Sequence, residues 1–226
     1  MLVIDQAISV IRRLIERSAA LGEPIDNTII AVGGTALSAH GIRDLTEDVD
    51  LYIPTFSDEV VYQLEKELKP IFGERFRLDV TATENLWGAI LLRDINERSP
   101  VYERLDMAGR TFVVKALSIE DLFLVKLSAD RAKDRQDLPL IAPRTNGNEL
   151  IARFNTITQW HGNRQALLRY ADEFIGQLDK QYGMTPQQSV PQLRLPPYVV
   201  ELLWQSYYPD QDSPSTPNPS QSGQTP

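Results

Sequence analysis

Three aspartates in the first half of the chain have the residue type and spacing for chemistry with a divalent cation. Asp48 and Asp50 flank Val49 in a run typical of a β-strand, so both carboxylates lie on one face of that strand. Two carboxylates about 4 Å apart repel each other by roughly 4 kcal/mol at an effective dielectric near 20. A divalent cation removes that cost, and all-oxygen ligands suit Mg²⁺ or Mn²⁺. Asp79 lies in a later predicted strand and would join the pair if the two strands are neighbours.

Each of these signals also has an ordinary structural explanation. An isolated Asp-x-Asp is more often a solvated strand edge, and Asp79 has Arg75 and Arg77 nearby as salt-bridge partners. Gly33-Gly34 falls between a buried strand and a short helix, where glycine lets the backbone approach a phosphate closely. Any strand-to-helix turn favours glycine, so this turn alone is a weak signal. Only the three features together indicate a site.

Hydrophobic periodicity predicts the elements that hold these residues. The first half alternates helices and strands, and the second half is helical. Strands are predicted over 28–32, 48–53, 76–81, 101–107 and 111–115, and helices over 3–21, 35–40, 57–68, 118–130, 149–160, 164–182 and 198–207. The predicted fold class is therefore α/β (α+β), a small mixed sheet flanked by helices and followed by a helical region. We expect a core over 1–117, a helical region over 118–208 and a disordered, Pro- and Ser-rich tail over 209–226.

Composition excludes several classes of function. The 226 residues include no cysteine and only two histidines, which rules out disulfides, thiolate or multi-histidine metal sites and a cysteine nucleophile. A net charge of −8 argues against a chain that coats a nucleic-acid backbone, although a local basic cleft is compatible with it. No apolar run reaches the length of a membrane span, and residues 1–10 do not form a signal peptide, so we expect a cytoplasmic protein. The nucleophile turn of serine hydrolases and the Walker phosphate loop are both absent.

Residues 31–52, AVGGTALSAHGIRDLTEDVDLY, resemble the signature of AbiEii-like nucleotidyltransferases, the toxins of bacterial abortive-infection and toxin–antitoxin systems. The shared positions are Gly33-Gly34-Thr35-Ala36-Leu37, Gly41, Arg43 and Thr46-x-Asp48-x-Asp50. The resemblance extends over roughly residues 28–140. It implies the nucleotidyltransferase core, in which Gly33, Gly34 and Thr35 hold the triphosphate. Asp48, Asp50 and Asp79 would hold two Mg²⁺ ions, with Asp79 near the attacking hydroxyl.

A second block adds three candidate nucleotide-binding residues. Lys126 lies on or beside the apolar stripe of the helix that begins at 119, where it either extends to the helix edge or contacts an anion. Lys133 and Asp137 are four residues apart, a spacing that also fits a solvated charged face. This block resembles the family's later motif, a lysine-containing helix followed by Lys-Asp-x-x-Asp. The resemblance implies that Lys126, Lys133 and Asp137 bind the nucleotide.

The sequence therefore predicts a Mg²⁺-dependent enzyme that transfers a nucleoside monophosphate from a nucleoside triphosphate to an acceptor hydroxyl. The resemblance implies an RNA acceptor, notably the 3′ end of tRNA, and a cognate antitoxin as protein partner. The stretch 142–170 is locally basic, with Arg144, Arg153, Arg164 and Arg169, and is either an RNA groove or ordinary helix surface. Two alternatives stay open: a nucleotidyltransferase that modifies proteins, and a catalytically silent module that binds a partner protein.

Overall fold

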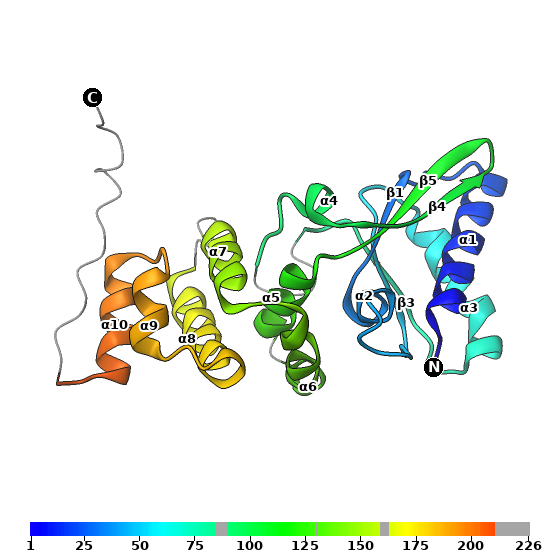
Figure 1. Cartoon of the computed structure of the whole chain (residues 1–226). Coiled ribbons are helices and arrows are strands. Elements are labelled where there is room, and N and C mark those ends of the chain that lie inside the picture. Colours follow the sequence, from blue (N-terminus) through cyan, green and yellow to red (C-terminus); the bar gives the residue numbers. More distant parts are fainter. Residues whose placement is uncertain (85–89, 130, 159–162, 211–226) are drawn as a thin grey trace, which may run out of the picture. The chain divides into compact units, whose positions relative to one another are not determined.

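The structure is a computed structural model that describes residues 1–84, 90–129, 131–158 and 163–210 (Figure 1). The chain forms two compact units, Met1–Arg144 and Thr145–Pro226. All the candidate site residues fall in the first unit.

A five-stranded mixed sheet with the order β3-β2-β1-β5-β4 forms the centre of the first unit. Its strands are β1 (Thr28–Ala31), β2 (Val49–Tyr52), β3 (Leu78–Thr81), β4 (Val101–Met107) and β5 (Arg110–Ala116). The central strand β1 pairs with β5 in parallel and with β2 in antiparallel orientation. β3 runs parallel to β2, and β4 and β5 form an antiparallel hairpin. The predicted fold class, a small mixed sheet flanked by helices, is confirmed.

Helices cover this sheet because their apolar stripes need a partner surface. The first unit contains α1 (Ile4–Leu21), α2 (Gly33–Ala39), α3 (Asp58–Phe72), α4 (Ile95–Arg98), α5 (Ile119–Ala129), α6 (Ala132–Ile141) and the 3₁₀ turn η1 (Ala142–Arg144). The stripe of α1 is buried against α3 and the sheet, with Ile11 and Ile15 fully inaccessible to solvent. α1 ends at Leu21, and the left-handed φ of 67° at the next residue, Gly22, turns the chain so that the N–H of Glu23 bonds to the carbonyl of Ser18 at 2.9 Å.

The strand that leads into the candidate site is buried on both faces. Ile29 and Ile30 of β1 are both fully buried, although their side chains point to opposite sides of the sheet. A strand covered on both sides is a continuous apolar run, as the sequence predicted. It delivers the chain directly into Gly33, where α2 begins and packs against β2.

The second unit is helical over its described residues. Its elements are α7 (Gly147–Thr158), α8 (Arg164–Tyr182), α9 (Pro186–Ser189), the 3₁₀ turn η2 (Val190–Gln192) and α10 (Pro197–Tyr207). Its core includes Phe154 stacked on Phe174, with ring centroids 4.3 Å apart, and on Tyr170, at 5.1 Å. Among the residues described in both units, no helix combines the length and apolar character needed to cross a membrane.

The division into units differs from the predicted organisation. The boundary lies between Arg144 and Thr145, so α5 and α6 belong to the same unit as the sheet. The predicted boundary between 117 and 118 falls inside that unit. Apolar periodicity cannot report this, because it shows that a helix has a buried face but not which surface covers it. The predicted disordered tail lies outside the described residues from 211 onward.

Candidate active site

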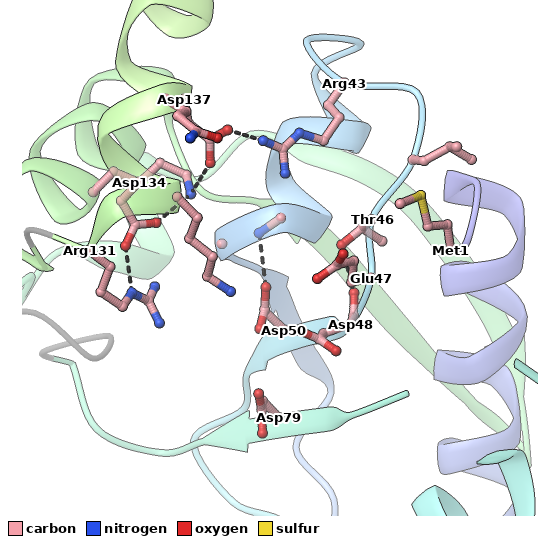
Figure 2. Close-up of a pocket in the computed structure, with 16 residues that line it drawn as sticks. Met1, Arg43, Thr46, Glu47, Asp48, Asp50, Asp79, Arg131, Asp134 and Asp137 are labelled. Carbon is pink, nitrogen blue, oxygen red and sulfur yellow. Dashed lines mark hydrogen bonds and ion pairs between the residues drawn. The ribbon is translucent and has the colours of Figure 1, made fainter. Parts of the chain in front are cut away.

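The candidate residues meet in a cavity of about 480 Å³ in the first unit (Figure 2). Four acidic side chains line one part of it, here called the carboxylate wall: Glu47, Asp48, Asp50 and Asp79. The other part, here called the cation wall, carries four basic and two acidic side chains: Arg43, Lys126, Arg131, Lys133, Asp134 and Asp137. Gly33 and Gly34 also line the cavity, as do Met1, Leu45, Thr46 and Gln136.

Strand pairing brings the three predicted catalytic aspartates together. β2 and β3 run parallel with Asp50 directly opposite Asp79, so their side chains share one face of the sheet. Asp48 lies two residues before Asp50, at the entrance to β2, and all three line the cavity. Within the described part of the chain, no three acidic or histidine side chains stand close enough to form a ready-made metal site. The carboxylates would therefore have to rotate to ligate one cation together.

The diglycine turn lies against one of these carboxylates. The N–H of Gly34 donates a hydrogen bond to Asp50 Oδ2 at 2.9 Å. Gly33 has a φ of 52°, and a Cβ on it would overlap the same oxygen. A Cβ on Gly34 would lie 2.6 Å from Thr46 Oγ1. The close approach that the two glycines permit is therefore an approach to Asp50, at the edge of the cavity.

The hydroxyl of Thr35 does not face the cavity, contrary to its predicted contact with the triphosphate. Thr35 is fully buried, and its Oγ1 accepts a hydrogen bond from the N–H of Asp50 at 2.9 Å. The same hydroxyl lies 3.4 Å from the carbonyl of Asp48, and Thr46 Oγ1 donates to that carbonyl at 2.8 Å. Because α2 packs on β2, the hydroxyl is used to fix the backbone that carries the two aspartates. Thr46 is a site residue whose role the sequence did not reveal.

Burial and mutual repulsion raise the pKa values of two aspartates on the carboxylate wall. Burial raises the pKa of Asp50 to about 6, opposed by its bond from Gly34 and reinforced by the charges of Asp79 and Asp48. Burial likewise raises the pKa of Asp48, opposed by Lys133 and reinforced by Asp79. Both shifts mean that the negative charge on this wall is poorly compensated by the protein. Oxygen donors with uncompensated charge fit a hard divalent cation.

Alanine at Gly33 is expected to disturb this wall, and Gly41 supplies the matched control. Both glycines have positive φ, 52° and 63°, but a Cβ on Gly41 would meet no atom within 4 Å. Gly41→Ala should therefore cost only the backbone strain, about 1 kcal/mol, and Gly33→Ala about 1 kcal/mol more because Asp50 must move. Thermal unfolding of the two variants measures the difference. Equal losses of stability would show that the Asp50 carboxylate is not held against the turn.

The cation wall is organised around one buried ammonium group. Lys126 Nζ lies 2.9 Å from Asp134 Oδ1 and 2.7 Å from Asp137 Oδ2. The second oxygen of each aspartate binds an arginine: Asp134 Oδ2 accepts from Arg131 Nε at 2.5 Å, and Asp137 Oδ1 accepts from Arg43 Nη2. Burial alone would raise the pKa of Asp134, but the bonds from Arg131 and Lys126 hold it below its ordinary value. These five side chains are here called the Lys126 network.

The three residues of the predicted nucleotide-binding block therefore have different environments in the structure. The ammonium of Lys126 is buried between two carboxylates, and Asp137 is one of them. Lys133 is exposed and lines the cavity. The sequence missed Arg43, Arg131 and Asp134 as site residues, although all three stand in the motifs it identified. Spacing along the chain gave no sign that Lys126 and Asp134 would face each other across the connection between α5 and α6.

The locally basic stretch 142–170 includes one arginine that solvent barely reaches. Arg153 is buried within α7, so it cannot contribute to an exposed groove. Arg144 belongs to the first unit and Arg169 to the second. An RNA groove, one of the two interpretations of this stretch, would therefore be without one of the four arginines.

Comparison with known proteins finds a family match that lies within the first unit. Residues 11–142 match the family described as nucleotidyltransferase of unknown function (DUF6036). The match covers more than half of the chain and lies within the first unit, which holds the whole cavity. No curated protein and no solved structure matches the chain. The prediction of a nucleotidyltransferase is confirmed at this level, whereas the AbiEii-like and toxin assignments stay predictions. The chain belongs to the DUF6036 family of nucleotidyltransferases.

Proposed function

We propose that the protein transfers a nucleoside monophosphate from a nucleoside triphosphate to an acceptor hydroxyl, with Mg²⁺ or Mn²⁺ as cofactor. The observation that carries this proposal is the division of one cavity into a carboxylate wall and a cation wall. A nucleoside triphosphate with its divalent cations presents both kinds of charge. Its phosphate oxygens suit the basic side chains, and its cations suit the carboxylates.

Asp48, Asp50 and Asp79 are the residues that would hold the divalent cations. Their donor set consists of oxygens alone, and the raised pKa values of Asp48 and Asp50 favour binding of positive charge beside them. When bound, the cations would neutralise charge on the phosphates during transfer. Asp50 keeps one oxygen on Gly34 N–H, and among the described residues no hydrogen bond involves its Oδ1. That oxygen is the one we assign to a cation.

The transfer itself needs few protein groups beyond these. The acceptor oxygen forms a bond to the α-phosphorus, and the bond from that phosphorus to the bridging oxygen of the β-phosphate breaks. Pyrophosphate leaves, and Asp79 accepts the proton of the attacking hydroxyl. Asp79 is exposed on the edge strand β3, where an incoming acceptor can reach it. Such reactions depend mainly on positioning and on compensation of phosphate charge.

For the acceptor we propose an RNA hydroxyl, with the 3′ end of tRNA as the first candidate. This part of the proposal rests on the resemblance of residues 31–52 to AbiEii-like nucleotidyltransferases, and a toxin or phage-defence role with a cognate antitoxin rests on it too. A protein acceptor is the competing outcome. Sensitivity of the labelled product to ribonuclease or to protease separates the two.

The test is label transfer by the purified full chain. The protein is incubated with each α-labelled nucleoside triphosphate, total RNA and Mg²⁺, in parallel with γ-labelled triphosphate and with EDTA. We expect label on RNA from an α-labelled nucleotide only, and none in EDTA. Asp48→Asn should lose the transfer, whereas Asp44→Asn, an exposed position outside the cavity lining, should keep it. Absence of labelled RNA or protein with every nucleotide, or equal transfer by both variants, would reject the proposal and leave a silent binding module.

A further inference from the structure

The positive charge of Lys126 is already compensated by two carboxylates, so it is not available to a phosphate. Its ammonium forms two ion pairs below 3 Å, and its side chain is only 6% exposed. Asp134 and Asp137, which hold it, are also buried, with exposed fractions of 0% and 2%. A nucleotide that displaced either carboxylate would leave that carboxylate buried and unpaired, which costs several kcal/mol. A direct contact between Lys126 and the triphosphate is therefore unfavourable.

The two aspartates transmit the position of Lys126 to two arginines. Each carboxylate uses one oxygen for Lys126 and the other for an arginine, Arg131 on Asp134 and Arg43 on Asp137. A carboxylate bound on both sides is fixed in rotation. The arginine that it holds is therefore fixed at the same time.

Both arginines reach the cavity with donors to spare. Their side chains are 38% exposed for Arg43 and 55% exposed for Arg131, and both line the cavity. Arg131 is held through Nε, and within the described part of the chain its two terminal nitrogens have no other partner. Arg43 is held through Nη2 alone, again among the described residues. A guanidinium group with free N–H donors in a fixed plane matches the geometry of phosphate oxygens.

We infer that Arg43 and Arg131 bind the phosphates of the nucleotide and that Lys126 is a positioning residue, an inference that rests on the proposed function and deepens it. The Lys126 network holds the two guanidinium groups in place before the ligand arrives. Lys133, the remaining basic residue of the wall, is exposed and is not a member of the network. Its flexible ammonium adds charge to the cavity but is not oriented by the network.

The probe for this inference is inorganic tripolyphosphate, which carries the phosphates without base, ribose or reaction. Its affinity is measured by titration calorimetry in EDTA and again in Mg²⁺. Arg43→Gln and Arg131→Gln should each weaken binding about tenfold or more. Arg12→Gln is the matched control, because Arg12 is also a partly exposed arginine paired with one carboxylate, Glu103, and it does not line the cavity. Its affinity should equal that of the unaltered protein.

A double-mutant cycle tests the positioning role. If Asp134 acts through Arg131, Asp134→Asn should weaken tripolyphosphate binding in the unaltered protein and have little further effect in Arg131→Gln. A merely structural loss would weaken both backgrounds by the same factor. Additive effects of the two substitutions would therefore overturn the positioning role. Circular dichroism confirms that each variant is folded.

Three outcomes would overturn the assignment of the arginines. The first is unchanged tripolyphosphate affinity in Arg43→Gln and Arg131→Gln. The second is no binding by the unaltered protein in either buffer, and the third is unchanged KM for the nucleoside triphosphate in arginine variants that still catalyse transfer. The label-transfer experiment tests the proposed function separately. If the arginine variants bind tripolyphosphate more weakly but no acceptor is ever labelled, the phosphate-binding role is supported and the transferase proposal is rejected.

Discussion

Asp50→Asn should abolish nucleotidyl transfer and at the same time stabilise the metal-free protein. The substitution keeps the size of the side chain and an oxygen that can accept the Gly34 N–H. It removes the negative charge that we assign to cation binding, so transfer should fall on the order of 10³-fold or more. The free energy of unfolding in EDTA at pH 7 should rise by about 1–3 kcal/mol.

The sign of the stability change follows from the pKa of Asp50. Burial raises that pKa from 3.8 to about 6 in the folded protein. Between these two values the folded state keeps a proton that the unfolded state has lost, so the free energy of unfolding falls as the pH rises through this window. Above pH 6 the wild-type protein carries the full cost of the buried charge. The amide in Asp50→Asn is neutral at every pH, so the variant should lose this part of the pH dependence.

Thermal unfolding from pH 4 to pH 7, in EDTA and in Mg²⁺, measures this prediction. In EDTA the gap in stability between Asp50→Asn and the wild type should widen with pH. In Mg²⁺ it should narrow, because a bound cation offsets the charge of Asp50 only in the wild type. Asp44→Asn serves as the control for removal of an exposed carboxylate. A variant that is less stable than the wild type in EDTA at pH 7 would contradict the proposed cost of the Asp50 charge.

Lys126→Met and Lys133→Met should differ strongly in stability, although the sequence assigned both lysines to nucleotide binding. Lys126→Met leaves Asp134 and Asp137 buried without their shared cation. Breaking a buried ion pair from one side costs about 3–5 kcal/mol, and we expect about 3 kcal/mol because each aspartate keeps an arginine. Lys133 is exposed, so Lys133→Met should change stability by less than about 0.5 kcal/mol.

Urea unfolding at pH 7 separates the two lysine variants. The signal should report the first unit, because the two units can unfold in separate transitions. The reverse order of stabilities, or equal stabilities, would show that Lys126 is not the centre of a buried network. Triphosphate affinity gives an independent readout: Lys133→Met should reduce it modestly while its stability stays unchanged.

The sequence predicted those helices and strands whose apolar residues recur with a clear period. The stripe of α1 and the stop at Gly22 are visible in the chain because burial of a helix face needs apolar residues every three to four positions. The short helices α4 and α9 have only four residues each, too few for a period, and they were not predicted. The sequence could not predict that Asp50 pairs with Asp79, because the residues of two strands do not show whether the strands are neighbours in the sheet.

In the site, too, the sequence predicted features set by local spacing but not contacts between residues far apart in the chain. Local spacing put Asp48 and Asp50 on one face, and the structure brings both to the cavity. The resemblance of residues 31–52 assigned Thr35 to the ligand, but packing of α2 on β2 turns its hydroxyl toward the backbone. The pairing of Arg43 with Asp137 joins residues 94 positions apart, and no local pattern encodes such a contact.

The sheet, α5 and α6 form one compact unit, so a truncated chain must include all of them to keep the cavity complete. A fragment that stops at residue 117 would encode the carboxylate wall but, of the described basic residues that line the cavity, only Arg43. A fragment that stops at residue 144 would encode every residue that lines it. Truncations designed for expression and crystallisation should therefore cut after η1, which ends at Arg144.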